Sequence, residues 1–342
     1  MTKAHTSPVQ ATYSAPARFA APEPLLADIL SWGRPHDSET EHRFLKEYLD
    51  KVPGMESDGF GNRHVTIGAS PVLYSCHVDT VGRYEGHQPL AYDAVTGMLG
   101  LESGKPGQCL GADDGAGVWI MLCMIAANRP GLYVFHRGEE VGCLGSKWIA
   151  KSNPALLRDI TAAIAFDRAG FSDVITHQAY GMTASDTFAN SLAGCLNAIN
   201  PRFTYKPDDT GVYTDTNEYA DLVPECTNLS VGYFGQHGPR ETLNVPHVTA
   251  LRDAMLVLDW RELTIDRKPG DAGDYGYFMG PYGQTMDDWR DGYARKPLGA
   301  PDDREFDTML TLVRENPEIA AHLLLEAGFE CDDILDAAFD LN

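Results

Sequence analysis

Gly111-Ala-Asp-Asp-Gly-Ala-Gly117 is the segment on which the interpretation of the chain depends, because it places two adjacent carboxylates, Asp113 and Asp114, at the start of an apolar helix. The small residues around them allow a sharp turn and a close approach of the backbone to a ligand. A simpler explanation is that the acidic pair caps free N–H groups and complements the helix dipole. The rest of the chain decides between these two interpretations.

Composition limits the class of protein. The chain has 342 residues, 43% of them hydrophobic, which is enough for one large α/β domain with extensions or for two domains. A formal net charge of −22 argues against nucleic acid or an anionic membrane as a partner. No apolar run is long enough to span a membrane, and the first residues lack the apolar segment of a signal peptide. The seven cysteines form no CxxC pair. They therefore predict free thiols and a cytoplasmic protein.

Apolar, β-rich runs alternate with helical patterns along most of the chain. Strands are predicted at 72–77, 132–136, 162–167 and 228–234, and helices near 116–128, 145–151 and 184–197. This alternation predicts an α/β fold in which a mainly parallel, mixed sheet is sandwiched by helices. Further predicted elements are two helices between 24 and 52, the second capped at Ser38, a strand at 64–67, an irregular hairpin or loop over 80–110 and a closing helix over 248–262.

The composition changes at three points and predicts four regions. Residues 1–22, rich in Ala, Pro, Ser and Thr, are expected to form a flexible arm. Residues 23–263 carry the alternating pattern and form the predicted catalytic domain. Residues 264–304 are rich in Gly, Pro, Asp and Tyr and predict an irregular extension or linker, and 305–342 predict a small acidic helical appendage.

Metal-ligand residue types follow the predicted strands at the point where each strand ends. His77 and Asp79 share one face of a strand, so His77 could bind a metal while Asp79 accepts its second ring proton. Ligands of such sheets bind beyond the carboxyl ends of the strands. The other side chains at these ends are Glu139, Glu140, Asp167 and His237.

Together with Asp113, these residues form a set of nitrogen and oxygen ligands without cysteine, which is typical of a hydrolytic metal centre. The proposed ligands are His77, Asp113, Glu140, Asp167 and His237. With one carboxylate bridging, they provide three protein ligands for each of two ions. Glu139, next to a ligand but not itself one, is well placed to act as the general acid and base.

The joint pattern resembles the di-zinc exopeptidases, a superfamily that includes bacterial zinc aminopeptidases, peptidase T and carboxypeptidase-like relatives. The resemblance covers about residues 24–262, with all five motifs in family order. It implies that His77 and Asp167 hold one zinc, that Glu140 and His237 hold the other, and that Asp113 bridges them. It further implies that Asp79 orients His77, that Glu139 is the general acid/base, and that the Asp113–Asp114 peptide bond is cis.

Two departures place the chain closer to the single-domain aminopeptidases than to peptidase T. Only 70 positions separate Asp167 from His237, which leaves little room for the lid or dimerisation domain that many relatives insert there. Gly115 stands where tripeptidase-like relatives often carry lysine. With an aspartate, not a glutamate, at position 167, the chain resembles the aminopeptidase and tripeptidase branches more than the carboxypeptidase and deacylase branches. Candidate substrate contacts are Asp215 or Glu218 for a peptide ammonium group and Arg240 for a terminal carboxylate.

The sequence thus predicts a zinc-dependent aminopeptidase that removes N-terminal residues from short peptides, with Co²⁺ or Mn²⁺ as possible substitutes for the two Zn²⁺ ions. One alternative is an amidohydrolase or deacylase of the same fold acting on N-acyl amino acids, because the same water-activating centre serves both reactions. Another is a catalytically inactive peptide-binding protein, which would be expected to lack a ligand or the general base. An oligomer is compatible with every one of these functions.

Overall fold

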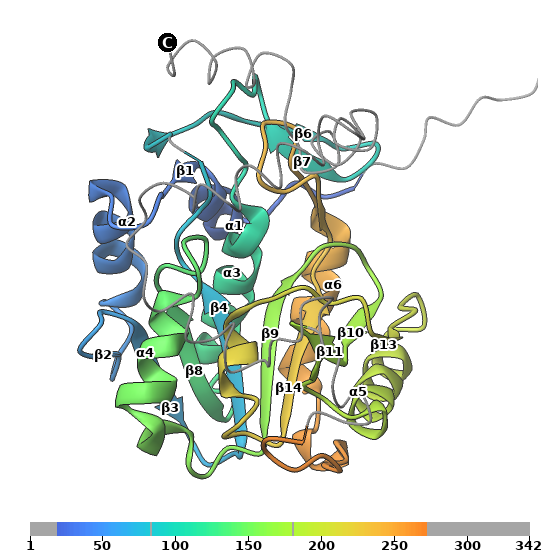
Figure 1. Ribbon diagram of the computed structural model, residues 1–342. Helices are drawn as coiled ribbons and strands as arrows, with labels where there is room; N and C mark the ends of the chain where they lie inside the picture. Colours follow the sequence, from blue (N-terminus) through green and yellow to red (C-terminus); the bar gives the residue numbers. More distant parts are fainter. Residues whose placement is uncertain (1–18, 83, 180, 272–342) are drawn as a thin grey trace, which may run out of the picture.

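A computed structural model describes residues 19–82, 84–179 and 181–271. Within these ranges the chain folds around a central mixed sheet with helices on both faces (Figure 1). In spatial order its strands are β13 (Lys206–Asp208), β10 (Asp173–Ile175), β14 (Glu225–Ser230), β9 (Ala162–Arg168), β4 (Val72–His77), β8 (Gly131–His136), β3 (Arg63–Ile67) and β2 (Glu56–Ser57). The predicted α/β fold with a mainly parallel, mixed sheet is confirmed.

The centre of the sheet is parallel and its margins contain antiparallel pairs. β14, β9, β4 and β8 run parallel to one another. β3 and β2 are antiparallel at one margin, and β10 is antiparallel to β14 at the other. Because β4, β8 and β9 are buried along most of their length, they appear in the sequence as nearly continuous apolar runs. Their carboxyl ends meet at one edge of the sheet, where the predicted ligands follow.

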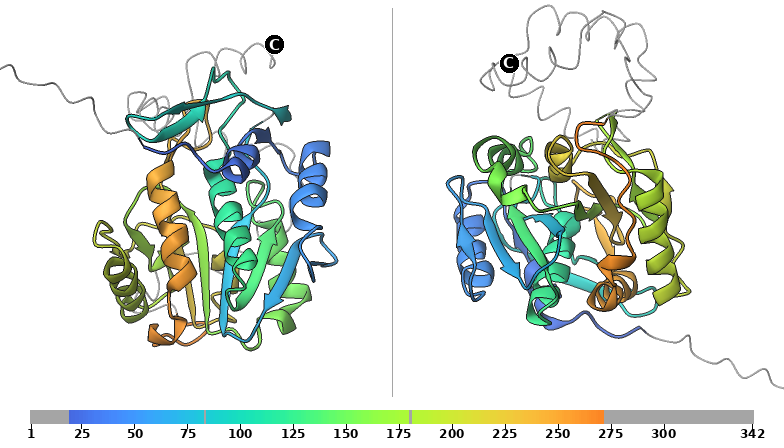
Figure 2. Two further views of the ribbon diagram at one scale, coloured as in Figure 1. Left: turned by 180° about the vertical axis from the view of Figure 1, so that it is seen from behind. Right: turned by 90° about the horizontal axis from the view of Figure 1, so that it is seen from below.

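The helices form a layer on each face. α1 (Pro24–Leu30), α3 (Ala112–Ala126) and α6 (Val245–Val257) lie together on one face, which the left view of Figure 2 shows. α4 (Leu144–Ser152) and the short 3₁₀ helix η3 (Asp215–Tyr219) pack together on the opposite side, and α5 (Asp186–Ile199) packs beside β10 and β13. A second 3₁₀ helix, η2 (Pro154–Leu157), follows α4.

The alternation of side chains along β4 decides on which face of the sheet the predicted ligands lie. Tyr74 and Cys76 belong to the apolar cluster that contains α1, α3 and α6, whereas Leu73 belongs to the smaller cluster beneath α4 and η3. Residues two positions apart share a face, so His77 points to the same side as Leu73. Asp167 has the same relation to Ala163 of the smaller cluster on β9. The ends of these strands therefore present both side chains on the α4 and η3 side of the sheet.

The N-terminal helices begin as predicted. The Ser38 hydroxyl accepts a hydrogen bond of 3.1 Å from the Glu41 amide and caps α2 (Glu39–Phe44), which continues into a π-helical turn, η1 (Leu45–Leu49). Such a cap satisfies one of the free N–H groups at a helix start.

Three segments differ from their predicted boundaries. Residues 80–110 include β5 (Gly86–His87), which pairs with β1 (Trp32–Gly33), and a regular hairpin of β6 (Leu90–Asp93) and β7 (Met98–Leu101). The strand expected at 228–234 is two strands, β14 and β15 (Tyr233–Phe234), separated at Gly232, whose φ is 101°. The closing helix α6 begins at Val245 and is followed by η4 (Trp260–Glu262). A second sheet contains, in spatial order, β15, β16 (Thr242–Asn244), β7 and β6. In a separate two-stranded sheet, β11 (His177–Gln178) pairs with β12 (Gly181–Met182).

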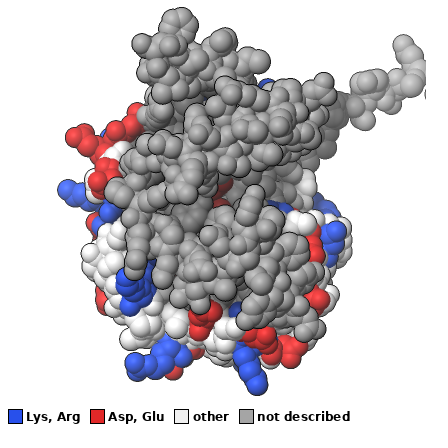
Figure 3. All heavy atoms as spheres, in the orientation of Figure 1, with Lys and Arg blue, Asp and Glu red and all other residues white. Residues whose placement is uncertain are grey.

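The predicted domain boundaries stay a prediction. The buried hydrophobic core of the described residues extends from Leu26 to Leu263. Of the predicted arm, 1–18 lies outside the described residues, and the Phe19 amide donates to the Ala94 carbonyl at 2.7 Å. The predicted regions beyond 271 also lie outside them. Among the described helices, none combines the length and apolarity needed to cross a membrane. Figure 3 shows acidic and basic side chains interspersed along the visible margin of one face.

Candidate metal centre

The predicted ligands come from five separate segments that meet beyond the carboxyl edge of the sheet. His77 ends β4 and Asp167 lies one residue before the end of β9. Glu140 follows β8, Asp113 lies in the first turn of α3, and His237 lies between β15 and β16. The peptide bond between Asp113 and Asp114 is cis, as the resemblance implies.

Asp113 lies between two groups of side chains and presents a different oxygen to each. Its Oδ1 is 2.9 Å from His77 Nε2, and His77 Nε2 is 3.6 Å from Asp167 Oδ1. Its Oδ2 is 3.1 Å from His237 Nε2, which lies 3.4 Å from Glu140 Oε2. In each group the three potential ligand atoms lie within 4.8 Å of one another. The structure therefore brings all five predicted ligands together as two triads that share Asp113.

The chemistry of these triads fits divalent zinc. Each offers one imidazole nitrogen and two carboxylate oxygens, a hard-to-borderline donor set that zinc accepts in tetrahedral sites with an open position. Four of the five side chains are largely buried, whereas the His237 side chain is 48% exposed. The site is therefore most exposed at His237.

The electrostatics are those of a crowded acidic site. Burial and the Asp113 charge raise the pKa of Glu140 to about 8. Burial opposes the ionisation of Asp113, but contacts with His237 and His77 hold its pKa below the usual range. The contact with Asp113 raises the pKa of His237 to about 9. Positive charge is thus strongly favoured between these groups, as expected for a cation site.

Glu139 lies beside the first triad without belonging to it. Its Oε2 is 4.0 Å from His77 Nε2, and its Oε1 accepts a hydrogen bond of 3.4 Å from the Cys143 thiol. Burial raises the pKa of Glu139 well above its usual value. A carboxyl group whose pKa is raised in this way is suited to both accepting and donating a proton.

The contacts of Asp79 differ from the prediction. The His77 Nδ1–H donates to the backbone carbonyl of Asp79 at 2.9 Å, whereas the nearest Asp79 carboxylate oxygen is 3.8 Å away. The carboxylate instead accepts hydrogen bonds from the amides of Gly138, Glu139 and Glu140 at 2.9, 3.2 and 3.2 Å. The backbone turns after β4 so that the carbonyl, not the side chain, meets the imidazole. The Asp79 side chain thus binds the loop that carries Glu140, which we call the ligand loop, and not the His77 ring.

The predicted substrate residues occupy different environments. Asp215 is 1% exposed, and its carboxylate contacts the Ser146 hydroxyl at 2.5 Å and His136 Nδ1 at 3.2 Å. These internal partners leave no open side for a peptide ammonium group. Glu218 is partly exposed and accepts a hydrogen bond from the Tyr213 hydroxyl. Arg240 is exposed in the loop between His237 and β16.

Several residues that contact the ligands were not found from the sequence. The Thr214 hydroxyl donates to Asp167 Oδ2 at 2.5 Å, and the Tyr233 hydroxyl donates to its Oδ1 at 3.2 Å. The Asp114 carboxylate accepts from the amides of His77 and Gly117. Asp114 has a sequence signal, because it directly follows Asp113 in the Gly111–Gly117 segment. Thr214 and Tyr233 have no local signal, because only the folded chain brings them to Asp167.

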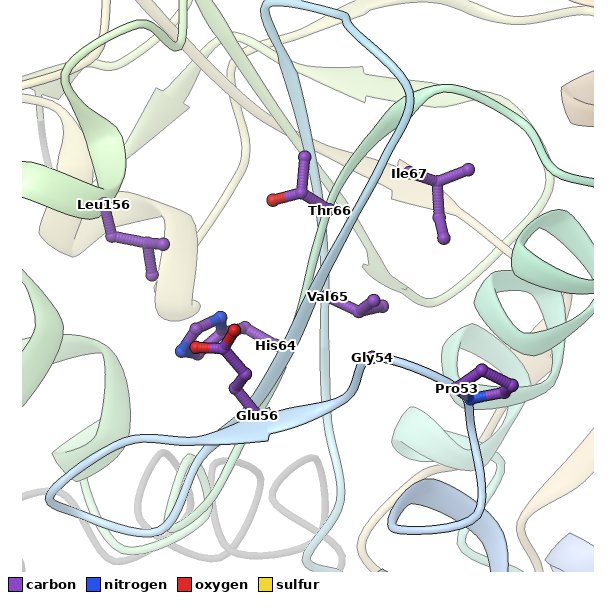
Figure 4. Close-up of a pocket in the computed structure, with 8 residues that line it drawn as sticks. All are labelled: Pro53, Gly54, Glu56, His64, Val65, Thr66, Ile67 and Leu156. Atoms are coloured by element: carbon purple, nitrogen blue, oxygen red, sulfur yellow. The ribbon is translucent and has the colours of Figure 1, made fainter.

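One surface hollow lies away from these residues. It has a volume of about 340 Å³ and follows the outer side of β3, where His64 lies beside its pairing partner Glu56 (Figure 4). None of the predicted site residues lines it. The chemistry of the triads, not this hollow, therefore identifies the functional site.

Comparisons with known proteins agree with the fold. Residues 62–223 match the model of Peptidase family M28. The fold is similar to that of a tripeptidase from Staphylococcus aureus subsp. aureus mu50, with a TM-score of 0.57 and 14% identity over 68% of this chain and 95% of that one. It is also similar to aminopeptidase PepT from Bacillus cereus ATCC 10987, with a TM-score of 0.51 and 13% identity over 68% and 95% of the two chains.

None of the curated proteins in the comparison matches the sequence. At identities this low the two solved structures establish the fold alone, and the family model adds a match over 162 of the 342 residues. His77, Asp113, Glu139, Glu140, Asp167 and Asp215 all fall within the matched residues. The resemblance to the zinc exopeptidases is confirmed, and residues 62–223 are similar to the peptidases of family M28.

Proposed function

We propose that this peptidase is a two-zinc aminopeptidase that removes N-terminal residues from short peptides. The observation that carries the proposal is the orientation of Asp113, whose two oxygens face two separate triads, each with one histidine. A single metal would need only one of these triads. An acidic helix cap, the simpler explanation of the Asp113–Asp114 pair, would need neither.

Each triad would hold one ion. His77 and Asp167 would bind the first, Glu140 and His237 would bind the second, and Asp113 would bridge them. Zinc ions bound there would lower the pKa of water, polarise the scissile carbonyl and stabilise negative charge on its oxygen. Co²⁺ or Mn²⁺ would be accepted by the same donors.

Glu139 would move the proton. Its carboxylate lies next to the first triad and is buried enough for its pKa to be raised. It would accept a proton from the attacking water and pass it to the leaving amine nitrogen. General acid–base catalysis of this kind contributes about 10²–10⁴-fold to a rate. The Cys143 thiol would fix the direction of the carboxylate.

Substrate recognition would use the more exposed side chains of Glu218 and Arg240 and not the buried Asp215. We assign Glu218 to the peptide ammonium group, because Asp215 is engaged with Ser146 and His136 inside the protein. Arg240, exposed beyond His237, would contact the carboxylate of a very short peptide. The names of the two similar structures, a tripeptidase and an aminopeptidase, support a free N-terminus as the recognised group. The described cysteines are all free thiols, which supports a reducing compartment such as the cytoplasm.

The test is a panel of free and N-acetylated di-, tri- and longer peptides, incubated with the zinc-loaded full chain and analysed by mass. We expect loss of the first residue from the free peptides only, abolished by chelator and restored by zinc. Cleavage of only the acetylated members would contradict the aminopeptidase and identify a deacylase. Absence of any turnover in a protein shown to hold two metals would favour the inactive binding protein.

A further inference from the structure

Glu241 connects the loop that carries His237 to the turn that carries Asp113. It lies four residues after His237 and is 1% exposed. Its Oε2 accepts a hydrogen bond of 2.8 Å from the Gly111 amide, and its Oε1 accepts one of 3.0 Å from the Asp113 amide. One carboxylate thus contacts the turn at two points, on either side of Ala112.

These two amides are among the N–H groups at the start of a helix that have no partner within the helix. The residue before α3, Gly111, has no side chain to cap them and adopts a φ of 70°. A carboxylate is the strongest acceptor available for such amides, and two oxygens on two amides fix the rotation of the turn as well as its distance. Because the second amide belongs to Asp113 itself, Glu241 fixes the backbone from which the bridging side chain projects.

Glu241 does this without being part of either triad. Neither group of potential ligand atoms in the described chain includes it. Both of its oxygens face backbone amides, so it contributes through the position of Asp113 and not by direct contact with an ion. Asp79 makes an equivalent arrangement on the opposite side of the site, where its carboxylate accepts from the amides of Gly138, Glu139 and Glu140.

We infer that Glu241 is a positioning residue that keeps the two oxygens of Asp113 directed at the two triads, and that without it the shared ligand serves both ions poorly. The inference rests on the proposed two-metal function. Partners that orient a metal ligand typically change metal affinity by about 10–100-fold when they are removed.

The test compares two isosteric substitutions in the full chain. Glu241→Gln keeps the size of the side chain but replaces one acceptor oxygen by an NH₂ group, which cannot accept from an amide. Glu225→Gln is the matched control. Glu225 is equally buried and its carboxylate accepts from the amides of Ser185, Asp266 and Arg267. It lies at the start of β14, at the opposite end of the sheet from the metal centre. Both changes remove the same kind of contact, and only one faces Asp113.

Metal binding is measured by titrating metal-free protein with Co²⁺ in competition with a chromophoric chelator, and the visible spectrum of the loaded protein reports the ligand geometry. We expect Glu241→Gln to weaken at least one of two Co²⁺ sites by tenfold or more and to change the spectrum. Glu225→Gln should leave affinity and spectrum unchanged, although both variants unfold at a lower temperature. Glu241→Asp, which keeps the carboxylate, should recover part of the affinity.

Wild-type affinity and spectrum in Glu241→Gln, with a lower unfolding temperature alone, would show a purely structural role and overturn the inference. If Glu241→Gln does not fold, Glu241→Asp decides: an unchanged spectrum and unchanged affinity would contradict the positioning role. A wild-type chain that binds fewer than two Co²⁺ ions would instead overturn the proposed two-metal function on which the role rests.

Discussion

The role of each acidic residue in the site depends on what its oxygens contact. Asp113 and Asp114 are adjacent and both buried, yet the first faces two histidines and the second accepts from backbone amides. Asp79 and Glu241 are likewise occupied by amides. Residue type and spacing predict that such a cluster binds metal. The division into ligands and supports follows only from the direction of each carboxylate.

Glu139 offers the sharpest test at the scale of a single residue. Replacing it by glutamine removes a proton carrier but none of the five proposed ligands, so Glu139→Gln should retain two zinc ions and lose about 10²–10⁴-fold in kcat. The measurements are zinc content by atomic absorption and the initial rate of peptide hydrolysis.

The neighbouring residue provides the control. Glu140→Gln removes a proposed ligand of the second triad, so it should lose metal as well as activity. Full activity in Glu139→Gln would show that another group transfers the proton. Equal zinc loss in both variants would show that Glu139 is a ligand.

At the scale of elements, the strands that carry the site were predictable because they are buried on both faces. β4, β8 and β9 are apolar runs of six or seven residues that end in a polar side chain, and their boundaries agree with prediction to within a residue or so. Their carboxyl ends gave the positions of His77 and Asp167.

Other elements escaped prediction for identifiable physical reasons. β14 begins at Glu225 and contains Thr227 and Asn228, which are buried because each finds a partner in the fold, so its pattern is not apolar. β10 and β13 have three residues each, too few to show a period. Thr214, Tyr233 and Glu241 reach the ligands through long-range chain contacts, which no local pattern encodes.

Gly115 shows how tightly α3 packs against α1. A Cβ added there would lie 2.8 Å from Leu30 Cδ2 and 3.3 Å from the buried Arg34 Nη2. Overpacking of this kind costs about 1–3 kcal/mol, so Gly115→Ala should lower the free energy of unfolding by that amount in urea.

The matched control is Gly194 in the middle of α5, where an added Cβ would have no heavy atom within 4 Å. Gly194→Ala should raise the free energy of unfolding by about 0.5–1 kcal/mol through the better helix propensity of alanine. If the two substitutions had the same effect, the packing argument for Gly115 would fail.

The α2 helix is joined to the ligand loop by a buried ion pair. The Glu41 carboxylate is fully buried and accepts from Arg137 Nε at 3.0 Å and Nη2 at 2.7 Å. Burial opposes its ionisation, but contacts with His36 and Arg137 lower the pKa of Glu41 to about 2 from an ordinary 4.5. Because the folded pKa is depressed, the charge stabilises the protein above pH 4.5, and this stabilisation is lost as the pH falls toward 2.

Glu41→Gln should therefore lower the free energy of unfolding by about 3–5 kcal/mol at pH 7, since it leaves buried Arg137 with only the exposed Asp37 as a charged partner. The difference from wild type should narrow between pH 4.5 and 3, as measured by urea unfolding of metal-free protein. Glu47→Gln, which removes an exposed partner of Arg43, should change little at either pH. A difference that stays constant with pH would show that the Glu41 charge is not the source.

At the scale of the whole molecule, stability and function meet in the metal centre. The chain carries a net charge of −22, and Asp113, Glu139, Glu140 and Asp167 lie close together in its interior. Only His77 and His237 oppose their repulsion within the triads. Without cations, burial first and the neighbouring carboxylates second raise the pKa values of Glu139 and Glu140. Divalent cations would remove this repulsion across five segments at once.

Removal of metal by a chelator should therefore lower the unfolding temperature of the entire domain, and zinc should restore it. At a free zinc concentration of 100 times the dissociation constant, each bound ion contributes about 2.7 kcal/mol. For a domain of this size that corresponds to roughly 5–10 °C per ion in scanning calorimetry. His237→Ala, which leaves only the first triad intact, should retain part of the increase. An unfolding temperature that zinc does not change would contradict this, because five segments that share two ions cannot unfold without releasing them.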